Sequence, residues 1–158
     1  MFLRTQSLNA QKFAGKHLQM SFSNNKTFEL WNGFMPLRRQ IGGTIGNELY
    51  SIEVFPPDFF KQFNPGTEFE KWAAVEVKDS SSLPDGIEIL ESPGGLYAVF
   101  LHKGPASEGP KTYNYIFSEW MPTSQYTVDE RPHFALMGDK YKSDSVDSEE
   151  EIWIPIRV

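Results

Sequence analysis

The chain has 158 residues, which is enough for one compact domain with a sizeable core. It carries 15 Lys and Arg against 21 Asp and Glu, a net charge of −6, so it lacks the basic surplus that drives binding to nucleic-acid phosphates. It contains no Cys, which excludes disulfides, thiolate nucleophiles and Cys-based zinc sites.

The hydropathy pattern indicates neither a signal peptide nor a membrane-spanning helix. Residues 1–7 lack a long apolar run, and no stretch of the chain approaches the ~20 apolar residues that a spanning helix needs. We therefore expect a soluble, cytoplasmic protein with no direct nucleic-acid partner and no membrane partner. His17, His102 and His133 do not have the spacing of metal-binding motifs, so we expect no metal site and no cofactor.

Alternating apolar and polar residues, with one helical pattern, describe the first half of the chain. An edge strand is expected first, followed by a longer strand in which Gly15 marks a bulge or bend. A helix comes next, kinked or divided by Pro36, and two more strands separated by a loop complete this half. In chain order these elements are expected at residues 2–8, 13–22, 27–40, 49–55 and 69–78.

A polar linker over residues 79–86 leads into a second half with a similar order of elements. A short strand and a turn are followed by a strand, a helix and two further strands. Ser107 is expected to cap the helix, and Pro110 is tolerated in its first turn. The expected ranges are 87–91, 96–102, 108–120, 131–137 and 152–158.

Several short motifs occur once in each half, at nearly constant separation. The pairs are Lys26-Thr27-Phe28 with Lys111-Thr112-Tyr113, His17 with His102, and Trp72 with Trp153. The separations differ by only a few residues, as loops of unequal length would produce. The pattern therefore predicts a duplicated unit.

We expect a single α+β domain over residues 1–158, made of two pseudo-symmetric strand–helix–hairpin repeats at about 8–80 and about 86–158. The strands form antiparallel sheets, each half contributes one helix, and a central groove lies between the halves. Ligand pockets are common at such seams. The chain has 13 Phe, 6 Tyr and 4 Trp, and these rings either fill the two cores or line the groove.

Longer motifs resemble those of a known family. They are residues 95–104 (GLYAVFLHKG), Tyr115-Ile116-Phe117, Trp120-Met121-Pro122, Arg131-Pro132-His133-Phe134, residues 148–156 (SEEEIWIPI) and, in the first half, residues 69–77 (FEKWAAVEV). Their order and spacing resemble the GyrI-like small-molecule-binding family, also known as the effector-binding domain of AraC- and MerR-type activators. The resemblance covers roughly residues 8–158 and is to its stand-alone members.

The resemblance implies two fused helix-plus-hairpin units, related by a pseudo-twofold axis, with an aromatic-lined ligand cavity between them. Members bind lipophilic, often cationic small molecules, and some resemble gyrase-inhibiting or cyclopropane-opening detoxification proteins. Relatives carry a Glu directly after the Phe of the Arg-Pro-X-Phe motif, where this chain has Ala135. Because Ala135 supplies neither a catalytic carboxylate nor a charge that attracts a cation, we do not expect an enzyme.

Glu53 is the candidate replacement for that carboxylate. It lies in the expected strand 49–55, which corresponds to the strand around Ala135, so duplication would place Glu53 near the mirror position. On its strand Glu53 shares a face with Ser51 and Phe55. That face is either solvated, with no function for Glu53, or turned toward the groove, where desolvation would raise the pKa of Glu53.

Aromatic side chains are the other expected ligand contacts, and core packing is the alternative role for each of them. A ring against a cation adds about 0.5–2 kcal/mol of cation–π attraction to the area that it buries. The expected ligand-binding residues are Trp31, Glu53, Trp72, Tyr97, Tyr115, Trp120, Phe134 and Trp153.

We expect the function to be sensing or sequestration of a lipophilic small molecule, neutral or cationic, in transcription regulation or in protection against drugs and toxins. One alternative is a hydrolase that opens strained electrophilic rings and uses Glu53 with Tyr97 or Tyr115. Another alternative is a protein-interaction module that acts on a topoisomerase-like partner.

Overall fold

The computed structural model describes residues 1–79, 83–142 and 145–158. The strands are β1 (Phe2–Leu8), β2 (Gln11–Met20), β3 (Leu49–Val54), β4 (Phe69–Val77), β5 (Glu88–Ser92), β6 (Gly95–Lys103), β7 (Thr127–Val128), β8 (His133–Met137) and β9 (Glu149–Arg157). The helices are α1 (Thr27–Phe34), α2 (Gly109–Tyr115) and α3 (Met121–Thr123), with single turns or short 3₁₀ and π segments at Met35–Gln40, Ala106–Glu108 and Ile116–Trp120. Part of the predicted linker, residues 80–82, lies outside the described residues.

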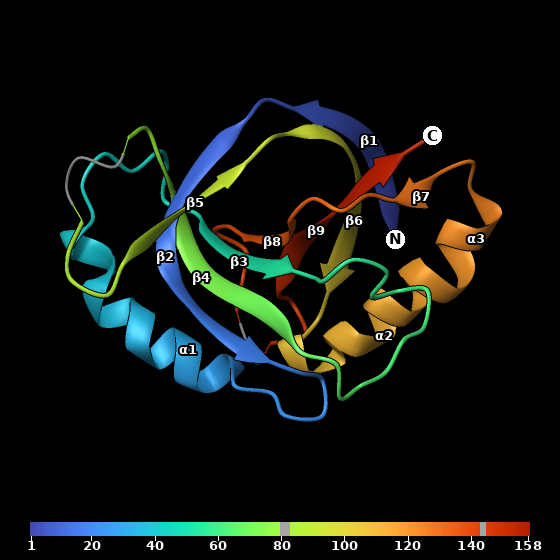
Figure 1. The fold of residues 1–158 in the computed structure, drawn as a ribbon, viewed down its shortest axis with the longest axis horizontal. Coiled ribbons are helices and arrows are strands. Elements are labelled where there is room, and N and C mark those ends of the chain that lie inside the picture. The colour runs from blue at the N-terminus through green and yellow to red at the C-terminus, as the bar shows by residue number, and fades with distance from the viewer. Residues whose placement is uncertain (80–82, 143–144) are drawn as a thin grey trace.

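The strands form one antiparallel sheet in the order β1-β6-β9-β8-β3-β4-β2-β5, and β7 pairs with β9. The predicted α+β class with antiparallel strands and one helical segment in each half is therefore confirmed. Strands β3 and β8 pair with each other at the middle of the order. In Figure 1 they run between α1 on one side and α2 with α3 on the other.

The first strand of each half lies against the other half. Strand β1 pairs with β6, and β5 pairs with β2. Leu8 faces Gly95, and Gln11 faces Ser92. Gln11 lies three residues after Leu8 and Ser92 three residues before Gly95, so the antiparallel register continues across the junction. Residues 2–15 and 88–100 thus form one bent two-stranded ribbon, which follows the two long arcs in Figure 1.

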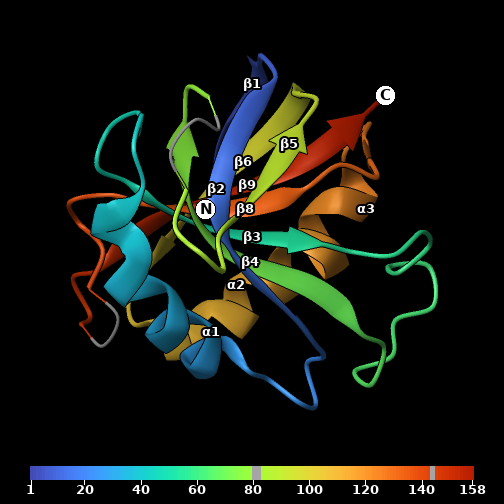
Figure 2. The ribbon, with the colours of Figure 1, turned by 60° about the vertical axis from the view of Figure 1, so that its left-hand side comes forward.

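The sheet curls around a core to which no helix contributes. Its buried members are Phe13, Tyr50, Ile52, Trp72, Ala74, Tyr97, Val99, Phe134 and Trp153. The other face of the sheet carries two separate cores, one beneath α1 and one beneath the α2–α3 segment, and Figure 2 shows these helices outside the strands. Successive strand residues point to opposite faces, so each strand supplies both layers. Burial of one large apolar side chain contributes about 1.5–3 kcal/mol.

The ends of the helices test two sequence predictions, one for Pro36 and one for Ser107. The first helix ends at Phe34 and continues as a 3₁₀ segment, Met35–Gln40, because Pro36 has no N–H to donate, and the predicted division there is confirmed. The predicted Ser107 cap is wrong. Ser107 lies inside a 3₁₀ turn, and α2 begins at Gly109 without a side-chain hydrogen bond to its first turn.

Gly15 permits a close approach of two strands. The predicted bulge is wrong, since the ladder of β2 with β4 runs through Gly15 without a register shift, and the ladder with β5 reaches Gly15 in register. A Cβ atom at this position would collide with the carbonyl oxygen of Ala73 and the side chain of Ala74. The glycine is therefore needed for its missing side chain.

The ladders correct one part of the repeat alignment. His17 lies opposite Trp72, whereas the residue opposite Trp153 is Val99, so His17 and His102 are not equivalent. The positions that correspond in these ladders are Met20 and His102. Each contacts the threonine in the following helix: Thr27 Oγ1 is 3.7 Å from Met20 Sδ, and Thr112 Oγ1 is 2.7 Å from His102 Nδ1.

Candidate functional site

Glu53 lies at the centre of the sheet, on the face that carries the helices. It is opposite Lys71 of β4 on one side and His133 of β8 on the other. Only 7% of the residue is exposed, so the alternative of a solvated face is wrong. The chain thus places an ionisable group between its two helical segments.

The ladders also place Glu53 at the mirror position of Ala135. Ile52 faces Trp72 in β4, Phe134 faces Trp153 in β9, and Ile52 and Phe134 face each other. Glu53 and Ala135 are the residues that follow this central pair. The expectation that Glu53 takes the mirrored place is confirmed by these registers.

Tyr113 of α2 donates a hydrogen bond to Glu53, with its hydroxyl 3.5 Å from Oε1. Burial raises the pKa of Glu53, while the charge of Lys71 and the bond from Tyr113 act in the opposite direction. Burial, and then the proximity of Glu53, also hold the pKa of the Tyr113 hydroxyl well above its ordinary value. The predicted polar partners of Glu53 were Tyr97 and Tyr115, and the structure replaces them with Tyr113.

Two further charged groups belong to this region. Lys71 Nζ donates to the hydroxyl of Thr27 in the first turn of α1, at 3.1 Å. Glu150 of β9 faces His102 in the ladder, and burial raises the pKa of Glu150 against the effect of His102 and Lys71. The desolvated carboxylates are therefore only partly compensated, and a bound cation would add positive charge.

Aromatic rings pack against His133, which lies opposite Glu53 in the β3–β8 ladder. The ring of Phe60, from the β3–β4 connection, stacks on Phe117 with centroids 4.3 Å apart and on His133 at 5.6 Å. Phe55 meets His133 edge-on at 4.9 Å. Surface hollows of about 400 and 330 Å³ occur elsewhere, at Ala10–Lys12 with Glu91–Pro93 and beside Arg38–Arg39. Neither hollow is lined by Glu53.

His133 is an uncharged histidine beneath these rings. It is 4% exposed, and its Nδ1 has no hydrogen-bond partner within the described part of the chain. Burial and the nearby charge of Arg131 lower its pKa from 6.5 to about 3. At neutral pH it is a polar, neutral surface against which an aromatic group can stack.

The aromatic residues expected to bind ligand lie in three different places. Trp72, Tyr97, Phe134 and Trp153 belong to the core inside the curled sheet, on the opposite face from Glu53. Trp31 packs on the core beneath α1, while Tyr115 and Trp120 pack on the core beneath α2–α3. Of the expected set, Glu53 is the residue that faces the space between the helices.

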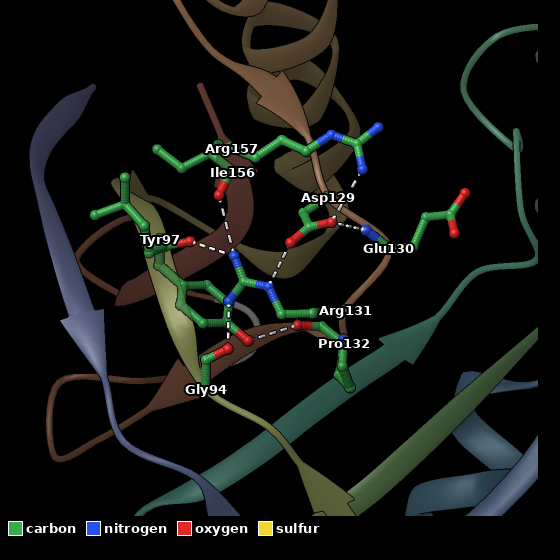
Figure 3. Close-up of polar contacts among 9 residues, drawn as sticks. Gly94, Tyr97, Asp129, Glu130, Arg131, Pro132, Ile156 and Arg157 are labelled. Carbon is green, nitrogen blue, oxygen red and sulfur yellow. Dashed lines mark hydrogen bonds and ion pairs between the residues drawn. The ribbon is translucent and has the colours of Figure 1, made fainter.

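The Arg-Pro-X-Phe motif has a structural role that accounts for Tyr97. Arg131 donates to the carbonyl oxygens of Gly94, Leu96 and Ile156 at 2.8, 2.6 and 3.1 Å, and Figure 3 shows most of this network. Its guanidinium lies 4.8 Å from the centre of the Tyr97 ring. Arg131 also pairs with Asp129: burial would raise the pKa of Asp129, but the bonds and charge of Arg131 bring it below its ordinary value.

Sequence reasoning missed Phe60, Tyr113, Phe117 and His133 as residues of this region. Tyr113 belongs to the duplicated Lys-Thr-Tyr motif, and His133 precedes Phe134 in the Arg-Pro-X-Phe motif and so lies on the opposite face of the strand. These two residues could therefore have been found from the sequence. Phe60 carried none, because a loop residue has no periodicity from which its direction could be inferred.

Comparison with known proteins identifies related domains. The family model described as GyrI-like small molecule binding domain matches residues 1–157. The transcriptional regulator BrlR of Pseudomonas aeruginosa is 25% identical over 130 residues, which are 81% of this chain and 45% of BrlR. The chain thus spans less than half the length of this relative.

Solved structures share the fold. SAV2435 bound to tetraphenylphosphonium superimposes with a TM-score of 0.74 at 16% identity, over 99% of this chain and 94% of SAV2435. The EcmrR C-terminal domain gives a TM-score of 0.65 at 16% identity, over 99% and 98% of the two chains. Within residues 1–79, 83–142 and 145–158, no helix is long and apolar enough to cross a membrane.

Proposed function

Because the chain belongs to the family of the GyrI-like small molecule binding domain, we propose that it binds a lipophilic cation in the groove between α1 and α2. The observation that carries this proposal is Glu53, a buried carboxylate of the central strand β3. Its ladder partner His133 is packed against aromatic rings from both halves. The fold of SAV2435, solved with tetraphenylphosphonium, supports the choice of this cation as a probe.

Three physical effects would act on such a ligand. A cation near Glu53 favours the ionised carboxylate, which burial alone disfavours. Aromatic walls such as Phe117 add about 0.5–2 kcal/mol of cation–π attraction. Burial of apolar ligand surface adds about 25 cal/mol for each Å². Charge would therefore set selectivity, and apolar area would supply most of the affinity.

Calorimetric titration with tetraphenylphosphonium and with neutral triphenylphosphine oxide tests the proposal. Glu53→Gln is expected to weaken binding of the cation by about tenfold or more, which corresponds to 1.4 kcal/mol, and to leave the neutral compound nearly unaffected. Glu91→Gln is the matched control, because Glu91 is an exposed carboxylate of β5 whose loss changes the net charge equally. Equal affinity of wild type and Glu53→Gln for the cation would refute the role of Glu53.

We further propose that binding serves either to sense a toxic compound for transcription regulation or to sequester it. The similarity to BrlR, named as a transcriptional regulator, supports the first role. Expression of the chain alone in bacteria separates the two. Sequestration predicts greater resistance to tetraphenylphosphonium that disappears with Glu53→Gln, whereas sensing through a longer protein predicts unchanged resistance.

The hydrolase alternative is favoured by one contact, the bond between Tyr113 and Glu53. A carboxylate and a phenol in one groove could act as base and acid during ring opening by water. Incubation with a cyclopropane-bearing electrophile, using wild type, Glu53→Gln and Tyr113→Phe, distinguishes the functions. Turnover that both substitutions abolish would favour the hydrolase, and its absence in wild type is the result expected for a binding protein.

A further inference from the structure

Phe60 joins the two halves across the groove. It packs against the core beneath α1, yet its ring lies parallel to that of Phe117 in the second half, with an interplanar angle of 16°. It also stacks on His133, whose partner in the β3–β8 ladder is Glu53. Phe60 therefore packs on His133, the ladder partner of Glu53, and joins it to Phe117 of the second half.

The neighbouring residues hold the β3–β4 connection in place, and the rings of Phe55 and Phe59 also meet Phe60 edge-on, at 4.9 and 5.1 Å. Phe59 is 5% exposed, and its ring contacts Phe55 at 4.6 Å and Phe69 at 6.0 Å, so it anchors the loop in the first core. Asp58, just before it, has a left-handed backbone with φ 61°, a conformation that costs energy for residues other than glycine. Phe60 itself is only partly buried.

We propose that Phe60 is an internal occupant of the ligand groove and that the aromatic group of a ligand replaces it. This inference rests on the proposed function. One planar ring exchanged for another preserves the stacking on Phe117 and His133. The exchange loses the edge-on contacts of Phe60 with Phe55 and Phe59. The cationic part of the ligand then lies near Glu53. The affinity of the wild-type protein is consequently reduced by the fraction of molecules in which Phe60 is docked.

Titration of wild type, Phe60→Ala and Phe63→Ala with tetraphenylphosphonium tests this inference. Phe60→Ala is expected to bind on the order of tenfold more tightly, because the docked state no longer competes. Phe63→Ala is the matched control, since Phe63 belongs to the same loop but is 55% exposed and contacts Phe22 and Phe59 outside the groove. Its affinity is expected to equal that of wild type.

A second variant and a kinetic measurement distinguish the proposed effect on binding from an effect of misfolding in Phe60→Ala. Phe60→Leu keeps apolar bulk for the first core but has no flat ring, and it is also expected to bind more tightly than wild type. In stopped-flow experiments the observed rate for wild type should level off with increasing tetraphenylphosphonium, because undocking of Phe60 becomes limiting, and the rate for Phe60→Ala should keep rising.

Two failures are distinguishable. If wild type binds the probe and both Phe60 variants bind equally or more weakly, Phe60 is a wall of the groove or is remote from it, and this inference is overturned while the proposed function stands. If no variant binds the probe, both proposals are overturned. Binding by Phe60→Ala but not by wild type supports both.

Discussion

Acid should destabilise this protein through His133. Burial holds the pKa of His133 at about 3 in the folded protein, against 6.5 for the unfolded chain. Because the unfolded chain binds a proton that the folded protein excludes, the stability contributed by the neutral histidine is complete above pH 6.5 and is lost as the pH falls toward 3. The linkage relation gives a loss of roughly 2–3 kcal/mol between pH 7 and pH 4.5.

That figure is a large part of the roughly 5–15 kcal/mol by which domains of this size are stable. It is insensitive to the folded pKa, since any value below about 4 leaves the folded imidazole neutral at pH 4.5. The raised pKa values of Glu53 and Glu150 act in the opposite direction, because folding with a raised carboxyl pKa is favoured by acid.

Urea unfolding of wild type and His133→Phe from pH 7 to pH 4.5 isolates the histidine. The phenyl ring preserves packing against Phe55 and Phe60, and the carboxylate contributions are common to both proteins. The difference in unfolding free energy should shift by roughly 2–3 kcal/mol in favour of His133→Phe as the pH falls. A constant difference between wild type and His133→Phe across this pH range would refute the reasoning.

Three other substitutions test the fold and the site. Arg131→Gln should lower the unfolding free energy by about 3 kcal/mol, because three carbonyl acceptors lose a charged donor. A loss below about 1 kcal/mol, measured by urea titration, would contradict this role of Arg131. Gly15→Ala should lower the unfolding free energy by about 3 kcal/mol or more, since the new Cβ collides with the backbone of β4. Gly86→Ala, with open space around it, should lower it by about 1 kcal/mol through left-handed strain. Similar melting temperatures for the two variants would argue against the collision. Ala135→Glu adds a second carboxylate on the face of Glu53, so each carboxylate raises the pKa of the other. The stability of this variant relative to wild type should fall as the pH rises from 5 to 8, by about 1.4 kcal/mol for each unit by which the pKa values rise. A pH-independent difference would show that the two carboxylates do not interact.

The sequence by itself determined the elements and their class. Alternation placed the strands, Pro36 marked the division of the first helix, and the duplicated motifs indicated two helix-bearing halves. These features depend on local rules, in which a residue's neighbours along the chain fix its backbone and the face on which it lies. The mirror relation between Glu53 and Ala135 followed from the duplication, and the strand ladders agree with it.

Only the tertiary structure decided which face of the sheet meets which layer. Trp72, Tyr97 and Trp153 have the strand positions that periodicity assigned them, but the sheet curls around them, and this curl arises from strand pairs distant in sequence. The direction of a loop residue such as Phe60 depends on a partner in the other half, Phe117, which no spacing along the chain encodes. Side-chain partners across the groove, including Tyr113 for Glu53, were settled by packing, because contacts between remote segments exist only once the chain has folded.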